Sequence, residues 1–244
     1  DAREAARPFA TIEDPMEHGL AVFDAVVVSP GVPLNRHPVA HAAEVAGTPI
    51  IGDIELFALA RPELPPHKVV GITGTNGKST TTALVAHILR EAGRPVLMGG
   101  NIGLPILEQE PLPEGGIYVL ELSSYQIDLT QSLDCDVAAL LNVTPDHLDR
   151  YDGFGGYAAA KARLFGMQGA GHAAVFGDSD DCTAEIAATV RDVRGEDVRI
   201  ARKAPEGQAD WPALQGPHNA QNVAVAVAIV EALGLTEAEW HPAL

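Results

Sequence analysis

A glycine-rich segment that ends in Lys78 and Ser79 contains the residues best suited to chemistry. Residues 69–82 read Val-Val-Gly-Ile-Thr-Gly-Thr-Asn-Gly-Lys-Ser-Thr-Thr-Thr, an apolar run followed by a turn and a helical pattern. Gly74 and Gly77 allow a sharp turn whose N–H groups face phosphate oxygens, and the following helix adds partial positive charge. Lys78 can reach the β- and γ-phosphates, and the Ser79 hydroxyl can bind Mg²⁺. This spacing predicts a phosphate-binding loop.

One position departs from the usual pattern of such loops. A glycine is expected where this chain has Ile72, and Gly71 stands one residue earlier. An ordinary strand–turn–helix corner is the alternative interpretation. We favour the phosphate-binding loop, because Gly-Lys-Ser between an apolar strand and a helix is a demanding coincidence.

Two further segments carry ionisable side chains where apolar strands are expected to end. Glu121 follows three large apolar residues, so its carboxylate needs a metal or a cationic partner, and Mg²⁺ prefers such carboxylates. Asp146, His147 and Asp149 follow a second apolar run and are expected at the start of a short helix. There His147 could bind a metal and Asp146 could orient it or act as a base. The alternatives are a salt-bridged or capping side chain for Glu121 and a helix cap for the Asp-His pair. The upstream loop favours metal binding, because a bound nucleotide carries a metal ion with it.

Three polar positions have less specific surroundings. Lys161 lies on an expected helix of mostly apolar and small residues, where a solvated lysine is the ordinary interpretation. Asn101 follows two glycines at the end of an expected strand, where its amide could meet a ligand or belong to a simple turn. Asn219 and Asn222 open the last long helix, where they could cap it or contact a base or ribose.

Buried-type strands alternate with helices along most of the chain. An apolar run at 21–30, a helix at 37–46, a strand at 49–51 and a helix from Asp53 to Ala60 precede a proline-containing linker at 61–67. Beyond it we expect strands at 68–73, 95–98, 117–122, 136–142, 172–176 and 198–201, and helices at 79–91, 103–109, 153–167, 180–191 and 218–233. Near-continuous apolar strands are typical of a parallel sheet covered on both faces, whose ligands bind beyond the carboxyl ends of the strands.

The predicted fold is therefore α/β with two parts. Residues 1–64 form a partial N-terminal Rossmann-like domain, and residues 65–244 form a doubly wound, P-loop ATPase-type domain with a mostly parallel sheet. The 244 residues carry a formal net charge of −17, which argues against nucleic-acid binding. Cys135 and Cys182 make no metal-type spacing and suit a reducing compartment. No stretch approaches the ~20 apolar residues of a membrane span, no secretory signal opens the chain, and Asp1 indicates a piece of a longer protein.

Taken together, these segments resemble the Mur ligase family, the ATP-dependent amide-forming enzymes of peptidoglycan synthesis. The resemblance covers nearly the whole chain. The motifs are most similar to those of the branch that adds D-glutamate. It rests on residues 74–80, on Gly-Gly-Asn-Ile-Gly at 99–103, on Glu-Leu-Ser-Ser-Tyr-Gln at 121–126, on residues 142–151, on Ala160-Lys161, on His218-Asn219 with Asn222, and on Val28–Pro33 and Gly52–Leu56.

The resemblance implies a role for each matching residue. Its ATP-binding residues would be Gly74, Thr75, Asn76, Gly77, Lys78, Ser79, Thr80, Asn219 and Asn222. Its magnesium ligands, in two sites, would be Ser79, Glu121, His147 and Lys161, the last as a carbamate formed with CO₂. Its substrate contacts would be Ser29, Pro30, Gly31, Asn101, Ser123 and His147, and its catalytic residues Lys78, His147 and Lys161. The implied partners are UDP-N-acetylmuramoyl-L-alanine, D-glutamate and ATP, and the implied protein is a cytoplasmic monomer without nucleic-acid or membrane partners.

Three departures from the family pattern accompany the resemblance. The opening strands of the first domain are absent, the segment between Arg202 and Leu214 is short, and the C-terminal domain that carries the amino-acid-binding residues is absent after Leu244. A sister ligase that adds L-alanine, a diamino acid or a dipeptide, or that extends folate with glutamate, is one alternative. A nucleotide- and substrate-binding module without turnover is another. A motor or GTPase is the third, but no switch-type segment is found.

Overall fold

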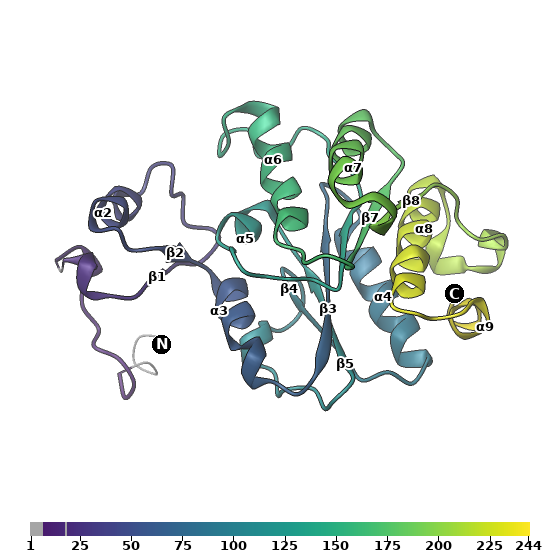
Figure 1. Ribbon diagram of the computed structural model, residues 1–244, viewed down its shortest axis with the longest axis horizontal. Helices are drawn as coiled ribbons and strands as arrows, with labels where there is room; N and C mark the ends of the chain where they lie inside the picture. The colour runs from purple at the N-terminus through teal and green to yellow at the C-terminus, as the bar shows by residue number, and fades with distance from the viewer. Residues whose placement is uncertain (1–6, 18) are drawn as a thin grey trace. The chain divides into compact units, whose positions relative to one another are not determined.

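The structure is a computed structural model that describes residues 7–17 and 19–244. It divides into two compact units, Asp1–Gly52 and Asp53–Leu244. The larger unit contains a sheet of six parallel strands in the order β4-β5-β3-β6-β7-β8, with β3 between β5 and β6 (Figure 1). In chain order the strands are β3 (His67–Thr73), β4 (Val96–Gly100), β5 (Gly116–Glu121), β6 (Val137–Leu140), β7 (Ala173–Gly177) and β8 (Val198–Ala201).

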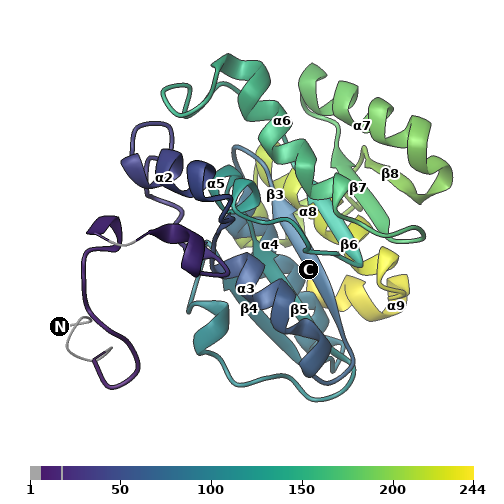
Figure 2. The same ribbon diagram turned by 60° about the vertical axis from the view of Figure 1, so that its left-hand side comes forward.

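Helices cover both faces of this sheet, as the doubly wound prediction requires. One face carries α3 (Asp53–Ala60), α5 (Ser124–Asp128), α6 (Gly153–Gly166) and α7 (Asp181–Arg194), whose apolar residues join one core cluster. The opposite face carries α4 (Lys78–Glu91), α8 (Pro217–Ala232) and α9 (Glu237–Trp240), whose residues join a second cluster. Figure 2 shows α4 and α8 behind the sheet, with α3, α5 and α6 in front of it. No helix among the described residues is long and apolar enough to cross a membrane.

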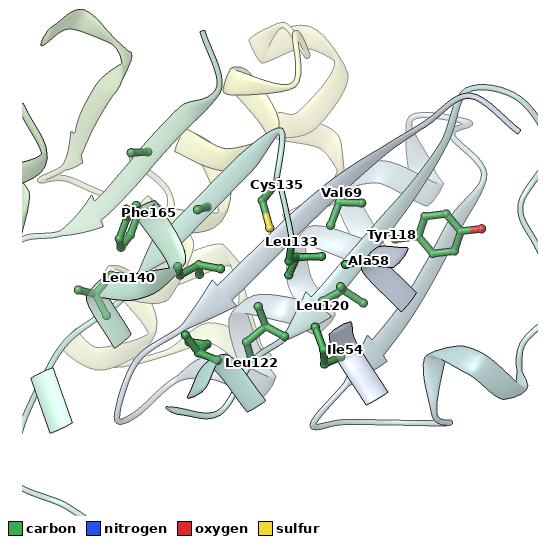
Figure 3. Close-up of a cluster of buried hydrophobic side chains, with 14 of the residues drawn as sticks. Ile54, Ala58, Val69, Tyr118, Leu120, Leu122, Leu133, Cys135, Leu140 and Phe165 are labelled. Atoms are coloured by element: carbon green, nitrogen blue, oxygen red, sulfur yellow. The ribbon is translucent and has the colours of Figure 1, made fainter. Parts of the chain in front are cut away.

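The alternation of side chains along each strand divides the core into these two clusters. In β5, Tyr118 and Leu120 face the α3 side, whereas Ile117 and Val119 face the α4 side. Figure 3 shows Leu120 beside Ile54 of α3 in the first cluster. Both faces of the strand are therefore apolar, which explains why these strands read as continuous apolar runs in the sequence.

Gly71 belongs to this core and not to the phosphate-binding turn. It lies within β3, where an added Cβ would meet the Cys135 sulfur at 2.8 Å and a Leu122 methyl at 3.2 Å. The neighbouring Ile72 is fully buried in the second cluster. The glycine at position 71 is therefore explained by the close packing of β3 against Cys135, and it is not a displaced glycine of the phosphate-binding loop.

The smaller unit has little regular structure. It contains two parallel two-residue strands, β1 (Val26–Val27) and β2 (Ile50–Ile51), and the helix α2 (Pro38–Ala46) comes between them in sequence. The buried cluster of this unit consists of Leu20, Val39 and Ala43. Within the apolar run at 21–30, strand β1 comprises only Val26–Val27, which pair with Ile50 and Ile51. Short 3₁₀ turns occupy Pro15–Glu17 and Leu20–Val22.

Most expected elements are present within one or two residues of their predicted bounds, and the exceptions have local causes. The helix expected at 103–109 is only a 3₁₀ turn at Ile106–Glu108, because Pro105 keeps Leu104 out of the helical region. Further 3₁₀ turns lie at Arg61–Glu63, Gly195–Asp197, Gln208–Asp210, Pro212–Leu214 and His241–Ala243. The compact units part at Gly52 and Asp53, whereas the linker at 61–67 predicted a boundary at 64 and 65.

Contacts of α3 explain why the division comes earlier. The buried Glu55 accepts hydrogen bonds from the backbone N–H groups of Gln131 and Ser132 at 2.7 and 3.0 Å and from the Ser132 hydroxyl at 2.7 Å. The Phe57 ring meets the Tyr118 ring edge to face, with centroids 5.1 Å apart. Helix α3 therefore packs on the sheet of the larger unit, although it precedes the proline-containing linker in sequence.

Candidate active site

The predicted phosphate-binding loop joins β3 to α4 at the carboxyl end of the central strand. Gly77 has a left-handed φ of +83° and directly precedes the helix, which begins at Lys78. The Lys78 side chain folds back over the loop, where its ammonium donates to the carbonyl oxygens of Gly74 and Thr75 at 3.0 and 2.9 Å. Burial lowers the pKa of Lys78, and the carboxylates of Glu121 and Asp146 partly oppose that shift. Ser79 and Thr80 are exposed in the first turn of α4.

Lys161 reaches the same loop from α6. Its side chain is 1% exposed, and its Nζ donates to the Gly74 carbonyl at 2.8 Å and lies 4.6 Å from the centre of the Tyr157 ring. Burial first, and the charge of Lys78 second, lower the pKa of Lys161 to about 7, against the carboxylates of Asp146 and Asp128. The solvated-lysine interpretation is therefore wrong. At neutral pH a large fraction of this side chain is the neutral amine.

Glu121 ends β5 beside the loop strand and is 2% exposed. Its Oε1 accepts a hydrogen bond from the Asn101 side chain at 2.9 Å, and its backbone carbonyl accepts one from the Asn101 N–H at 2.8 Å. Its other carboxylate oxygen, Oε2, is buried without a hydrogen-bond partner. The structure therefore brings Glu121 and Asn101 together and leaves Oε2 as an atom that could bind a metal ion. A negative charge buried on that oxygen is unfavourable unless a cation lies beside it.

His147 follows β6 in an irregular segment. Its backbone has a left-handed φ of +50°, and a residue in that conformation cannot begin an α-helix. The short helix expected at Asp146–Asp149 is therefore absent. The imidazole is about half exposed and lies against the Tyr125 and Tyr157 rings, with centroid distances of 5.1 and 6.3 Å. Its Nε2 lies 3.5 Å from a carboxylate oxygen of Asp146.

The asparagines at the start of α8 also meet the loop. An added Cβ on Gly77 would lie 2.3 Å from the Asn222 Oδ1, so the Asn222 side chain packs directly against the loop. Asn222 donates to the Asn219 side chain at 3.2 Å, and Asn219 donates to the Gln215 carbonyl at 3.1 Å. The structure thus places Asn222 at the loop and links Asn219 to it.

The predicted substrate contacts fall in different surroundings. Ser123 is the N-cap of α5, where its hydroxyl accepts a hydrogen bond from the Gln126 N–H at 3.2 Å in a capping box. Ser29, Pro30 and Gly31 lie in the smaller unit, in a turn closed by a hydrogen bond from the Val32 N–H to the Ser29 carbonyl at 3.0 Å. The other two predicted contacts have been described above, Asn101 at Glu121 and His147 beyond β6.

Two residues at the loop were given no role by the sequence. Asn142 contacts Thr75 and Asn76 through backbone and side chain. Tyr157 is 1% exposed, and its hydroxyl lies 3.2 Å from the Thr75 Oγ1. The spacing of Tyr157 four residues before Lys161 would have placed both on one face of a helix. Asn142 stands where a strand was expected to end, which is the other signal that was available.

The described residues contain no group of three or more His, Cys, Asp and Glu side chains arranged to hold a metal ion. Of the four predicted magnesium ligands, two are residues of these types, Glu121 and His147. The other two are Ser79 and Lys161. The buried, unpartnered Oε2 of Glu121 fits a cation. Lys161 fits one only after its amine has become an anion.

Comparison with known proteins agrees with this geometry. The family model for the Mur ligase middle domain matches residues 72–212. The chain is 64% identical over 246 residues to the UDP-N-acetylmuramoylalanine–D-glutamate ligase of Novosphingobium aromaticivorans, covering 100% of this chain and 56% of that protein. It is 62% identical to the protein of the same name from Sphingopyxis alaskensis, covering 97% of this chain and 55% of that protein. The chain thus spans about half the length of these relatives.

Solved structures with the same fold are more distant in sequence. A UDP-N-acetylmuramate:L-alanyl-gamma-D-glutamyl-meso-diaminopimelate ligase from Neisseria meningitidis has a TM-score of 0.66 at 19% identity, covering 100% of this chain and 91% of that chain. The MurF ligase of Thermotoga maritima, solved in complex with ADP, has a TM-score of 0.58 at 21% identity, covering 82% of this chain and 58% of that chain. From the family match together with the loop, Glu121 and Lys161, the chain belongs to the Mur ligase family.

Proposed function

We propose that this chain is the nucleotide-binding part of an ATP-dependent ligase that joins D-glutamate to UDP-N-acetylmuramoyl-L-alanine through an acyl phosphate. The relatives named for that reaction, at 64% and 62% identity, support the choice of substrates. The observation that carries the proposal is the convergence of Lys78 and Lys161 on the Gly74 carbonyl, in a loop that β3 and α4 position for phosphates. Cytoplasmic location and a monomeric state are part of this proposal.

ATP is the proposed nucleotide at the loop. The N-terminus of α4 supplies N–H groups and partial positive charge, and Lys78 exchanges its two carbonyl acceptors for phosphate oxygens. Asn222 packs against Gly77 and Asn219 contacts Asn222, so both are suited to the nucleoside side of the triphosphate. Within an acidic protein, this local positive charge is what draws an anionic nucleotide.

Mg²⁺ is proposed as the cofactor, and Ser79, Glu121, His147 and carbamylated Lys161 are the residues that would hold it in two sites. The ion neutralises phosphate charge and makes the γ-phosphorus more electrophilic. Glu121 is suited to this task because one oxygen is held by Asn101 and the other has no partner. The His147 ring contacts the Tyr125 and Tyr157 rings, which favours one side of the imidazole for packing and leaves the rest accessible.

Carbamylation of Lys161 follows from the state of its amine. CO₂ adds only to a neutral amine, and burial lowers the pKa of Lys161 to about 7. The N–C bond forms as the nitrogen loses one proton to solvent, so the product is an anion and removes the repulsion between Lys161 and Lys78. It also converts a buried cation into a ligand for a metal beside the phosphates.

The proposed reaction has two steps. The carboxylate of the muramoyl substrate, held by Asn101, His147 and Ser123, attacks the γ-phosphorus, and ADP leaves. The amine of D-glutamate then attacks the acyl carbon, and phosphate leaves with the pair of electrons of the broken C–O bond. The first step joins two anions, so the positive groups at the loop supply much of the rate acceleration. Ser29, Pro30 and Gly31 are proposed to bind the uridine diphosphate end.

The test is a phosphate-release assay on the full-length protein with ATP, Mg²⁺ and UDP-N-acetylmuramoyl-L-alanine. We expect release that depends on D-glutamate and not on L-alanine, a diamino acid or D-alanyl-D-alanine. Release with one of those acceptors instead would identify a sister ligase. Calorimetric binding of an ATP analogue without turnover of any acceptor would identify a binding module.

A further inference from the structure

Asn142 lies two residues beyond the end of β6 and takes part in a continuation of its pairing with β3. The two strands pair through Thr73 and Leu140, and the Leu141 N–H then donates to the Thr73 carbonyl at 3.0 Å. The Thr75 N–H donates to the Asn142 carbonyl at 2.9 Å. The sheet-like ladder therefore continues past the end of both strands and into the phosphate-binding loop.

The Asn142 side chain adds one more step to this ladder. The Asn76 N–H donates to the Asn142 Oδ1 at 2.8 Å, and the Asn142 Nδ2 donates to the Asn76 carbonyl at 3.0 Å. A carboxamide offers one acceptor and donors in the same plane, so it imitates a backbone peptide group. Both polar backbone groups of Asn76 are thus occupied by one side chain.

These contacts fix which way each peptide group of the loop faces. The loop peptides are trans, so a carbonyl and the N–H of the next residue point in opposite directions. The carbonyls of Gly74 and Thr75 face Lys78, and accordingly the N–H groups of Thr75 and Asn76 face Asn142. The next peptide is reversed, because the Asn76 carbonyl faces Asn142. The Gly77 N–H therefore points away from Asn142, toward the side on which the Lys78 ammonium lies.

We propose that Asn142 is a positioning residue for the nucleotide: by holding Asn76, it turns the Gly77 N–H toward the phosphates and withdraws the N–H groups of Thr75 and Asn76 from them. This proposal rests on the proposed function, since it presumes that a nucleotide binds at the loop. The reversal lies across Asn76, whose N–H and carbonyl both face Asn142, and Gly77 with φ +83° then leads the chain into α4 without strain. The phosphate-facing N–H groups are then those of Gly77 and the first turn of α4.

Amide hydrogen exchange in the unaltered full-length protein tests this arrangement directly. By NMR, the Thr75 and Asn76 amides are expected to exchange slowly without nucleotide, and saturating Mg·ADP is expected to leave them unchanged. The Gly77 amide is expected to exchange fast in the free protein and to slow when Mg·ADP binds. An Asn76 amide that exchanges fast until Mg·ADP arrives would overturn the proposal, because it would place that N–H on the phosphates.

A variant measures the effect on affinity. Asn142→Ala removes both contacts to Asn76, and we expect the Kd for Mg·ADP to rise about tenfold, the effect of two neutral hydrogen bonds. The matched control is Gln168→Ala, which also removes a carboxamide with two backbone contacts, here donated to the carbonyls of Cys135 and Ala173 near the opposite end of β6 and β7. The control is expected to lose stability but to keep the affinity. Equal affinity of Asn142→Ala and the unaltered protein would contradict the proposal.

The outcomes separate this proposal from the proposed function. If the unaltered protein binds no Mg·ADP, the nucleotide assignment itself fails. If it binds and the Asn142→Ala protein binds equally well, only the role of Asn142 fails. Should Asn142→Ala not fold, the exchange measurement on the unaltered protein still decides.

Discussion

Lys78 and Lys161 donate hydrogen bonds to one acceptor, the carbonyl oxygen of Gly74, at 3.0 and 2.8 Å. Two ammonium groups at one oxygen repel each other, and the charge of Lys78 is the second cause, after burial, of the lowered pKa of Lys161. The two lysines come from different helices, α4 and α6, so the tertiary fold creates this electrostatic coupling. On the proposed function, phosphates bound at Lys78 or a carbamate at Lys161 would relieve this repulsion.

The first prediction concerns Lys78. In the full-length protein, Lys78→Ala is expected to lower the rate of acyl-phosphate formation by about 10²–10³, the usual effect of losing one electrostatic contact to the transition state. ADP release with the muramoyl substrate measures it. Lys203→Ala is the control, because Lys203 is exposed and forms an exposed ion pair with Glu206 at 3.5 Å. Unchanged ADP release from Lys78→Ala would remove the loop from the mechanism.

The second prediction concerns Lys161 as a carbamate. Lys161→Ala is expected to be nearly inactive and to recover part of its activity with formate or acetate, which replace the missing carboxylate. The same salts are expected not to restore Lys78→Ala, because that variant lacks a cation. Full activity of Lys161→Ala without any added carboxylate would show that the side chain has no part in the reaction.

The third prediction is a pH dependence of stability. The pKa of Lys161 is about 7 in the folded protein and 10.5 ordinarily, so the unfolded chain binds more protons between these values. The destabilisation by Lys161 is therefore complete below pH of about 7 and fades as the pH rises toward about 10. In CO₂-free buffer, the unfolding free energy of the unaltered protein should rise with pH relative to Lys161→Met. Parallel pH profiles from urea unfolding would contradict the lowered pKa.

The fourth prediction separates backbone strain from contact at Gly77. Gly77→Ala places a Cβ 2.3 Å from the Asn222 Oδ1 at φ +83°, whereas Gly93→Ala has a similar φ of +74° and nothing within 4 Å. Both variants should lose about 1–2 kcal/mol of stability from left-handed strain. Only Gly77→Ala should also lose affinity for Mg·ADP, measured by calorimetry. Equal affinities in the two variants would show that Asn222 yields without consequence.

The fifth prediction concerns the attachment of α3. Glu55→Gln weakens three hydrogen bonds to a buried carboxylate, and we expect a loss of about 1–3 kcal/mol in unfolding free energy. Glu63→Gln, at an exposed carboxylate after the same helix, is expected to change stability by less than about 0.5 kcal/mol. Denaturant unfolding of both variants measures the difference. A Glu55→Gln protein as stable as Glu63→Gln would mean that α3 is only loosely attached.

The sequence predicted those features that depend on residue type and local spacing. Glu121 ends an apolar strand and Lys78 begins the helix that follows another, so their place beside a parallel sheet followed from the order of elements. The left-handed φ of His147 could not be predicted, because its contacts with the Tyr125 and Tyr157 rings arise only in the folded chain. The contacts of Asn142 with Asn76 join positions 66 apart, which only the pairing of β3 with β6 brings together.

The boundary that the linker predicts at 64 and 65 and the division of the compact units at 52 and 53 depend on different signals. Prolines at 62, 65 and 66 indicated a linker by composition, but composition does not report that Glu55 and Phe57 contact Ser132 and Tyr118. A local signal for a flexible segment therefore competed with long-range contacts, and the contacts decide where the compact units part. The functional division into a substrate part at 1–64 and an ATP-binding part at 65–244 stays a prediction.

The packing of α3 also determines how the protein can be shortened. A recombinant version starting at residue 65 would lack Ile54, Phe57 and Ala58, which pack on one face of the sheet. Tyr118 and Leu120 on that face would then become more exposed to water. Such an apolar surface promotes self-association, whereas a version starting at Asp53 would keep that surface sealed.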